Sequence, residues 1–77
     1  MKRKETLTKE VGKRLMKERE GKGLSREALA QKANISDKYL YDIEAGNKCM
    51  SIFILHKLVT VLEVSLDWLI MGDKLKK

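Results

Sequence analysis

The stretch "SREALAQKANISDKYLYDIEAG", residues 25–46, decides the fold. It places two short amphipathic segments on either side of a small polar break, "KANIS" at residues 32–36. Ser25 and Ser36 are good N-cap residues, because a serine hydroxyl accepts a hydrogen bond from a free backbone N–H of the first helical turn. Asn34 tolerates the left-handed conformation that bulkier residues avoid. The pattern predicts two short helices joined by a tight turn, with the exposed face of the second projecting outward.

Upstream of this stretch, apolar residues recur every four positions and predict a first helix with one apolar face. The segment "GKG", residues 21–23, should end it, with Gly23 in the left-handed position. Thr6 or Thr8 could cap its beginning. The apolar face consists of Leu7, Val11 and Leu15.

Downstream, Gly46 should stop the third helix, while Ser51 and Ser65 should cap a fourth and a fifth, which Gly72 closes. "SIFIL", residues 51–55, taken alone resembles a buried strand, because it is apolar and partly β-branched. The helical spacing of apolar residues continues to Leu62, which favours a helix. The residues expected to face inward are Leu40 and Ile43, then Ile52, Leu55, Leu58, Val59 and Leu62, then Leu66, Leu69 and Ile70.

These patterns predict an all-α bundle of five short helices packed around one core, since none is long enough to be stable alone. The 77 residues suit one small domain. We expect a basic N-terminal arm at residues 1–7, a domain at 8–72 and a short basic tail at 73–77. No secretory signal or membrane span is recognisable, and Cys49 as the one cysteine cannot form an internal disulfide, so we expect a protein of the reducing cytoplasm.

The net charge of +6 suggests a polyanionic partner. Residues 1–22 hold nine Lys and Arg against four Glu, whereas residues 23–50 hold four of each sign. The excess therefore lies in the arm and the first helix. A solvated surface alone would also explain it, so charge needs a second feature before it indicates DNA.

An ordered set of short motifs resembles the Cro/CI-like, Xre-type helix-turn-helix regulators, similar to phage repressor DNA-binding domains. The motifs are "VGKRL" (11–15), "KGLSREALAQKANIS" (22–36), "YLYDIEAG" (39–46) and "LEVSLDWLIMGD" (62–73). The resemblance implies a five-helix lambda-repressor-like fold, with a third helix that reads operator DNA in the major groove. It also implies a transcription regulator, expected to be a repressor, that binds double-stranded DNA as a homodimer.

The resemblance implies roles for individual residues. Arg19 and Glu44 match a pair that links the first helix to the recognition helix, although two ordinary surface charges would be worth little. Arg26 stands at a position that often meets DNA, and a cation there otherwise opposes the helix dipole. The positions that match base-reading residues are Asp37, Lys38, Tyr41 and Asp42; those assigned to phosphates are Arg26, Tyr39, Asn47 and Lys48.

Each of these positions keeps an alternative. Asp37 could simply complement the dipole of its helix, and an aspartate at Asp42 can only accept from a cytosine amino group or repel phosphate. Lys38 could read guanine, and Tyr41 could contact a thymine methyl group or a sugar. Tyr39 could support the fold while its hydroxyl reaches a phosphate.

Apolar residues beyond the needs of the core suggest an interface. Phe53 points away from the predicted core, and Trp68 and Met71 share the outward face of the fifth helix, so we expect these three in a dimer interface. Trp68 could instead cover the core loosely. Two further positions depart from the family, since Met50 replaces a common proline and Glu63 a common glycine.

An enzyme is the weakest interpretation. His56 is the only histidine and Cys49 has no obvious base beside it, so we expect no catalytic residues, no metal and no cofactor. No small-molecule ligand is evident. The alternative function is a protein–protein interaction module, antitoxin-like or adaptor, built on the same fold.

Overall fold

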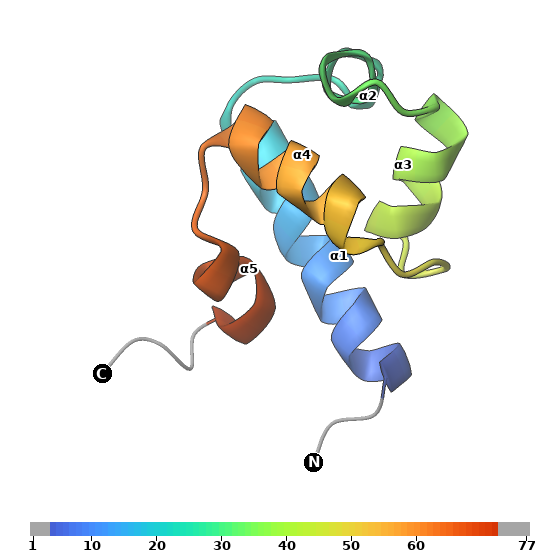
Figure 1. Ribbon diagram of the computed structural model, residues 1–77, viewed down its shortest axis with the longest axis vertical. Coiled ribbons are helices and arrows are strands. Elements are labelled where there is room, and N and C mark those ends of the chain that lie inside the picture. Colours follow the sequence, from blue (N-terminus) through green and yellow to red (C-terminus); the bar gives the residue numbers. More distant parts are fainter. Residues whose placement is uncertain (1–3, 73–77) are drawn as a thin grey trace.

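The computed structural model describes residues 4–72, which form five helices (Figure 1). Over this range there is no strand, so the predicted all-α fold is confirmed, and the "SIFIL" stretch lies at the beginning of a helix. The predicted ends 1–3 and 73–77 lie outside the described residues. The helices are α1 (Lys4–Gly21), α2 (Arg26–Ala33), α3 (Asp37–Glu44), α4 (Ile52–Leu62) and α5 (Leu66–Met71).

A serine caps the beginning of each of the last four helices, as predicted. Its hydroxyl oxygen accepts a hydrogen bond from the backbone N–H three residues later, at 3.0–3.2 Å. This bond satisfies one of the N–H groups that the first helical turn leaves without a partner. The four caps are Ser25, Ser36, Ser51 and Ser65.

The predicted beginning of the first helix was wrong. α1 starts at Lys4, so Thr6 and Thr8 lie inside the helix and do not cap it. The residues from Lys4 to Leu7, in the expected basic arm, are therefore helical, because lysine, glutamate and leucine are good helix formers. The predicted end is confirmed, since α1 stops at Gly21 and Gly23 has a φ of +73°.

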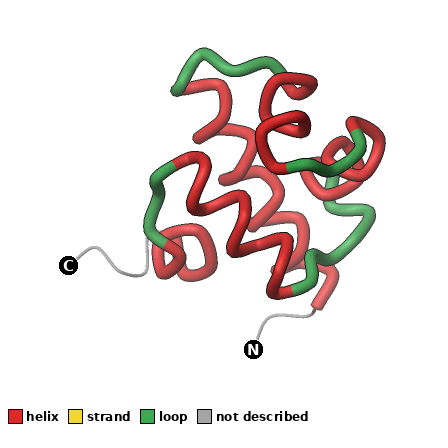
Figure 2. Tube along the Cα trace, turned by 45° about the horizontal axis from the view of Figure 1, so that its top comes forward, coloured by secondary structure: helices red, strands yellow, loops and turns green. Residues whose placement is uncertain are grey.

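α1 forms the spine of the domain. Figure 1 shows it in the middle of the molecule, with α3 and α5 on opposite sides, and Figure 2 shows α4 running beside it. α1 packs against both α3 and α5, while α2 packs against α3 and α4. The side chains with almost no exposed area are Leu15, Leu29, Leu40, Ile43, Leu58, Leu62 and Leu69.

Gly12 allows α3 to lie directly against α1. A Cβ atom at this position would stand 2.9 Å from the carbonyl oxygen of Glu44 and would also collide with that of Ile43. Because both obstacles are backbone atoms, neither can move aside without moving the helix. The end of α3 is therefore seated on α1 by close backbone contact.

Three apolar residues that were predicted to face inward are exposed. Ile52 is 76% exposed, Leu66 46% and Leu7 37%. Each lies in the first turn of its helix, before the helix has run onto the core. The helical period was therefore correct, but it was extended one residue too far toward each N-terminus.

Two connections use left-handed backbone at residues other than glycine. Asn34 has a φ of +57° between α2 and α3, as predicted. Glu63 has a φ of +56° after α4, at the position where the family commonly has glycine. The backbone thus has a conformation that suits glycine, and it is less favourable for Glu63 because the Cβ atom crowds the neighbouring carbonyl oxygen.

Candidate nucleic-acid interface

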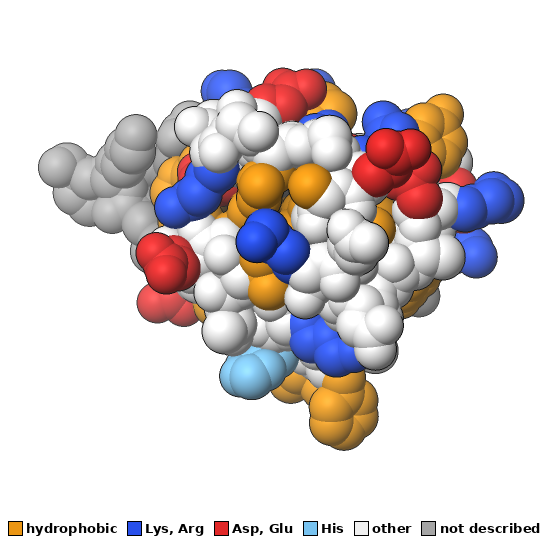
Figure 3. Space-filling view, turned by 90° about the horizontal axis from the view of Figure 1, so that it is seen from above, with side chains coloured by type: hydrophobic (Ala, Val, Ile, Leu, Met, Phe, Trp, Pro, Cys, Tyr) orange, Lys and Arg blue, Asp and Glu red, His pale blue; other side chains and the backbone are white. Residues whose placement is uncertain are grey.

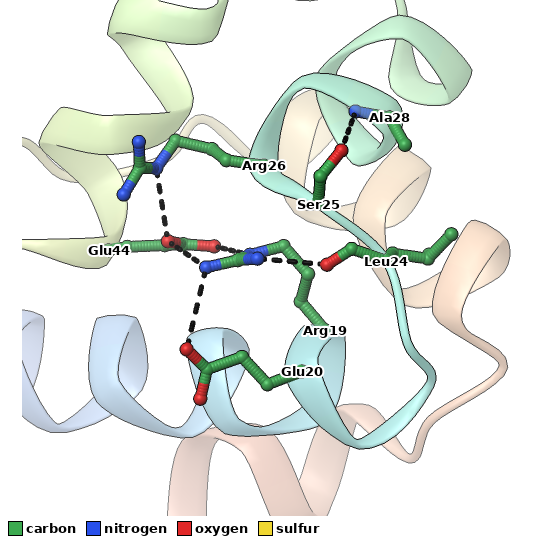
Figure 4. A network of polar contacts seen from close by, with 7 residues as sticks. All are labelled: Arg19, Glu20, Leu24, Ser25, Arg26, Ala28 and Glu44. Carbon is green, nitrogen blue, oxygen red and sulfur yellow. Dashed lines mark hydrogen bonds and ion pairs between the residues drawn. The ribbon is translucent and has the colours of Figure 1, made fainter.

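A buried ion pair joins α1 to the end of α3, as the sequence predicted (Figure 4). Arg19 Nε donates to Glu44 Oε2 at 2.7 Å, and Arg19 Nη2 donates to Glu44 Oε1 at 3.1 Å. Arg19 Nη1 also donates to the carbonyl oxygen of Leu24 at 2.9 Å. Both charged residues are only 7% exposed. The guanidinium thus fixes α3 and the segment before α2 relative to α1.

The electrostatics of this pair keep Arg19 charged. Its hydrogen bond to Glu44 is the largest influence and raises the pKa of the guanidinium, while burial acts in the opposite direction. A pKa raised on folding means that protonation favours the folded state. The part of the stability that depends on the protonated state of Arg19 is therefore complete below the ordinary titration range of arginine and is lost only as the pH rises through the raised pKa.

Arg26, the first residue of α2, lies between this pair and the outer surface of α3. Its Nε is 3.5 Å from Glu44 Oε1 (Figure 4). Its guanidinium carbon is 5.0 Å from the centre of the Tyr41 ring. Nε is buried and makes no hydrogen bond, so it meets Glu44 as an ion pair only. Glu44 and Tyr41 therefore hold Arg26 at the junction of α2 and α3 by charge and stacking.

The outer face of α3 carries three of the four residues predicted to read bases. Asp37, Lys38 and Tyr41 are exposed, and half of the Tyr41 surface is accessible. Asp37 is the first residue of the helix, where its carboxylate complements the helix dipole. The face thus offers one cation, one acid and one aromatic ring.

Asp42 is not on that face, contrary to the prediction. The residue is only 6% exposed, and its Oδ2 lies 3.4 Å from Lys38 Nζ and 3.8 Å from Lys48 Nζ. The chain folds back over it after α3, and the N–H groups of Asn47 and Lys48 donate to its backbone carbonyl oxygen. Asp42 therefore lies beneath two lysines rather than beside a base edge.

The turn after α3 gathers further polar residues. Asn47 and Lys48 are exposed, and Lys48 Nζ lies 5.8 Å from the centre of the half-buried Tyr39 ring. Gly46, with a φ of +80°, touches the stem of Lys9 from α1. Lys9 was not predicted to lie beside this turn, because no spacing along the chain links the first helix to it.

Surface charge on the face that carries α2 is mixed rather than gathered in one patch. From the end that carries α2, lysine and arginine side chains are interspersed with acidic and apolar ones (Figure 3). A large continuous positive area is absent from the face shown in that view.

The residues expected at a dimer interface differ in exposure. Phe53 is 77% exposed and Met71 45% exposed, as their outward positions predicted. Trp68 is half-buried and packs against the core, so only part of its ring can reach a partner.

Cys49 and His56 are both exposed. Within residues 4–72 no three histidine, cysteine or acidic side chains come together as a metal site would require. The helices in this range are also too short or too polar to cross a bilayer.

Comparison with known proteins places this geometry in context. The family model described as helix-turn-helix matches residues 15–69. A chain in the structure of the SinR protein/SinI protein complex is similar, with 38% identity and a TM-score of 0.73 over 77% of this chain. The present chain spans only 58% of the length of that one. No curated protein sequence matches.

Two restriction–modification controller proteins are similar over most of their length. C.AhdI from Aeromonas hydrophila is 34% identical with a TM-score of 0.76, covering 83% of this chain and 96% of its own. A mutant of C.Esp1396I is 30% identical with a TM-score of 0.75, covering 86% of this chain and 88% of its own.

Proposed function

The chain belongs to the helix-turn-helix family, of the Cro/CI-like, Xre type, and from this premise we propose that it is a DNA-binding transcription regulator. It acts in the cytoplasm as a non-enzymatic repressor that reads operator DNA in the major groove with α3. The similarity to two restriction–modification controller proteins supports the proposal.

One observation carries the proposal: Arg26 of α2 and Tyr41 of α3 form one surface across the two helices of the motif. The guanidinium lies 5.0 Å from the ring centre, and Glu44 anchors it from behind. A cation stacked on an aromatic ring next to an outward-facing helix suits a phosphate beside a base edge.

Base reading and positioning are then separate tasks. Lys38 and Tyr41 contact base edges, and Asp37 either accepts from a cytosine amino group or only serves the helix dipole. Phosphate contacts come from Arg26, Tyr39, Asn47 and Lys48, and from Lys9 beside Gly46. Asp42 holds Lys38 and Lys48 in place instead of reading a base.

The active form is a homodimer with Phe53, Trp68 and Met71 in its interface. The exposure of Phe53 and Met71 supports this arrangement, since burial on association would remove apolar surface from water. Two recognition helices would then enter successive major grooves about 34 Å apart. Phe53→Ser should weaken the dimer without unfolding the monomer, which sedimentation at several protein concentrations can measure. A protein that stays monomeric both free and on DNA would exclude this arrangement.

Binding to the region upstream of the chain's own gene tests the function. The operator fragment and a scrambled duplex of equal composition are titrated with the protein at several salt concentrations. Lys38→Ala should cost about 1–3 kcal/mol on the operator and much less on scrambled DNA. Arg26→Ala should weaken binding on both duplexes and reduce the salt slope by about one unit.

Lys57→Ala is the matched control. Lys57 is an exposed lysine on α4, outside the proposed interface, so its replacement by alanine removes the same charge as Lys38→Ala. It should leave the ratio between operator and scrambled DNA unchanged. If Lys38→Ala weakened both duplexes equally, α3 would not be the reading helix.

A second candidate is a protein–protein interaction module. Ile52 and Phe53 are adjacent and each about three-quarters exposed, and one similar chain was solved within a complex of two proteins. If the protein binds a protein partner but shows no saturable binding to the region upstream of its gene at moderate salt, the interaction module would be the better interpretation.

A further inference from the structure

An apolar cavity of about 170 Å³ lies behind the end of α3. Its walls come from α1, α3, α4 and α5 and from the connection between α3 and α4. Val11 and Ile43 form part of its inner wall and are buried, whereas Leu7 and Cys49 at its rim are exposed. The cavity opens to solvent at this rim, so it is a pocket in the surface rather than an enclosed void.

We propose that this cavity is a binding site for a small neutral apolar molecule of about the size of one aromatic ring. An engineered cavity of about 150 Å³ lined by apolar side chains binds benzene, so the volume is sufficient. Leu55 of α4 and Ile70 of α5 line it as well, so an occupant would contact four helices and the connection between α3 and α4. Displacing water from such walls favours binding.

The polar groups at the cavity explain why the ligand is neutral. Lys48 is the one charged residue among the described residues that line it, and its ammonium group is directed to Asp42 at 3.8 Å and to the Tyr39 ring. The hydroxyl of Thr8 and the thiol of Cys49 lie 3.3 Å apart and hydrogen-bond to each other. No charge is left over to pair with an anionic or cationic ligand.

The position of the cavity gives such a ligand a route to the DNA-facing surface. Ile43 belongs to α3, and Lys48 lies in the turn that carries proposed phosphate contacts. An occupant would restrain both relative to α1. The binding itself does not depend on DNA, so its failure would leave the proposed regulator function intact.

Titration of the whole protein with benzene, followed by the methyl NMR signals, is the test. The methyl signals of the lining residues should shift in a saturable way, and all should fit the same dissociation constant; these residues are Val11, Ile43, Leu55 and Ile70. The methyl signals of Leu29, which is buried elsewhere in the core, should not shift. Benzoate, which has the same ring and a negative charge, should bind at least about tenfold more weakly, since a buried unpaired charge is disfavoured. Shifts that grow linearly with benzene on all methyl groups alike, or tighter binding of benzoate, would overturn the proposal.

Two pairs of variants localise the site. Cys49→Phe places a ring at the rim on an exposed loop and should abolish the saturable shifts, whereas Cys49→Ser should retain them. Leu55→Phe should fill the cavity from α4, whereas Ile54→Phe changes a neighbouring half-buried residue outside the lining and should leave binding unchanged. If folded Cys49→Phe and Leu55→Phe both bound benzene as the wild type does, the cavity would not be the site.

Discussion

Removing Glu44 should destabilise the fold more than removing Arg19, although the two residues form one pair. Glu44 accepts two hydrogen bonds from Arg19 and also lies 3.5 Å from Arg26 Nε. Glu44→Ala therefore leaves two guanidinium groups of like charge close together, and Arg19 remains buried. Arg19→Ala leaves a buried carboxylate that still has Arg26 beside it.

The magnitude follows from burial. Breaking a buried ion pair by deleting one partner costs about 3–5 kcal/mol, because the other charge loses its compensation. We place Arg19→Ala near the lower end of this range and Glu44→Ala near the upper end. A chain of this length has a free energy of unfolding of about 4–12 kcal/mol, so either variant would lose about a quarter or more of it.

Urea unfolding followed by circular dichroism measures these differences for both single variants and the double variant. The double variant should lose less than the sum of the single losses, because the charge that each single variant strands is then absent. Arg26→Ala is the matched control: it removes the partially exposed cation and should cost less than either. Additive losses, or a larger loss for Arg19→Ala than for Glu44→Ala, would refute the reasoning.

Three other changes test separate features. Asp42→Asn should leave the preferred base pairs unchanged in titrations against operator variants, because a buried carboxylate does not reach a base edge; a changed preference would return Asp42 to the reading residues. Glu63→Gly should raise the free energy of unfolding by about 1 kcal/mol in thermal melts, since left-handed backbone costs a side-chain-bearing residue about that much; a lower melting temperature would show that the glutamate side chain compensates. Gly12→Ala should lower the free energy of unfolding by about 1–3 kcal/mol, because the added methyl group forces α3 away from α1. Gly21 has open space around it, so Gly21→Ala should lower that free energy far less. Equal losses in urea unfolding would disprove the close contact.

Local signals in the sequence predicted most of the fold. The four serine caps and the left-handed Asn34 depend on a few neighbouring residues, and the structure has them as expected. The errors were at helix beginnings, where periodicity cannot tell the first turn from the rest. Ile52 and Leu66 fit the apolar face but precede the core.

The candidate site was less predictable because its contacts cross the chain. Asp42 lies on the outer side of α3 by periodicity alone, and only the turn after the helix buries it. Arg26 was expected at DNA, but its stacking on Tyr41 depends on the angle between α2 and α3. The cavity beside Cys49 likewise requires the packing of several elements and has no signature along the chain.

The close seating of α3 on α1 at Gly12 has a consequence for how the protein could evolve. The attachments of α3 to α1 run through its backbone, through Glu44 and through inward leucine and isoleucine side chains, and none of them involves the outward positions 37, 38 and 41. Mutations at these three positions can therefore accumulate without loosening α3 from α1, although a change at position 41 also removes the ring on which Arg26 stacks. If α3 reads DNA as proposed, such a scaffold can acquire a new operator through changes at a few positions, and a randomised library restricted to them should yield folded proteins with altered target sequences.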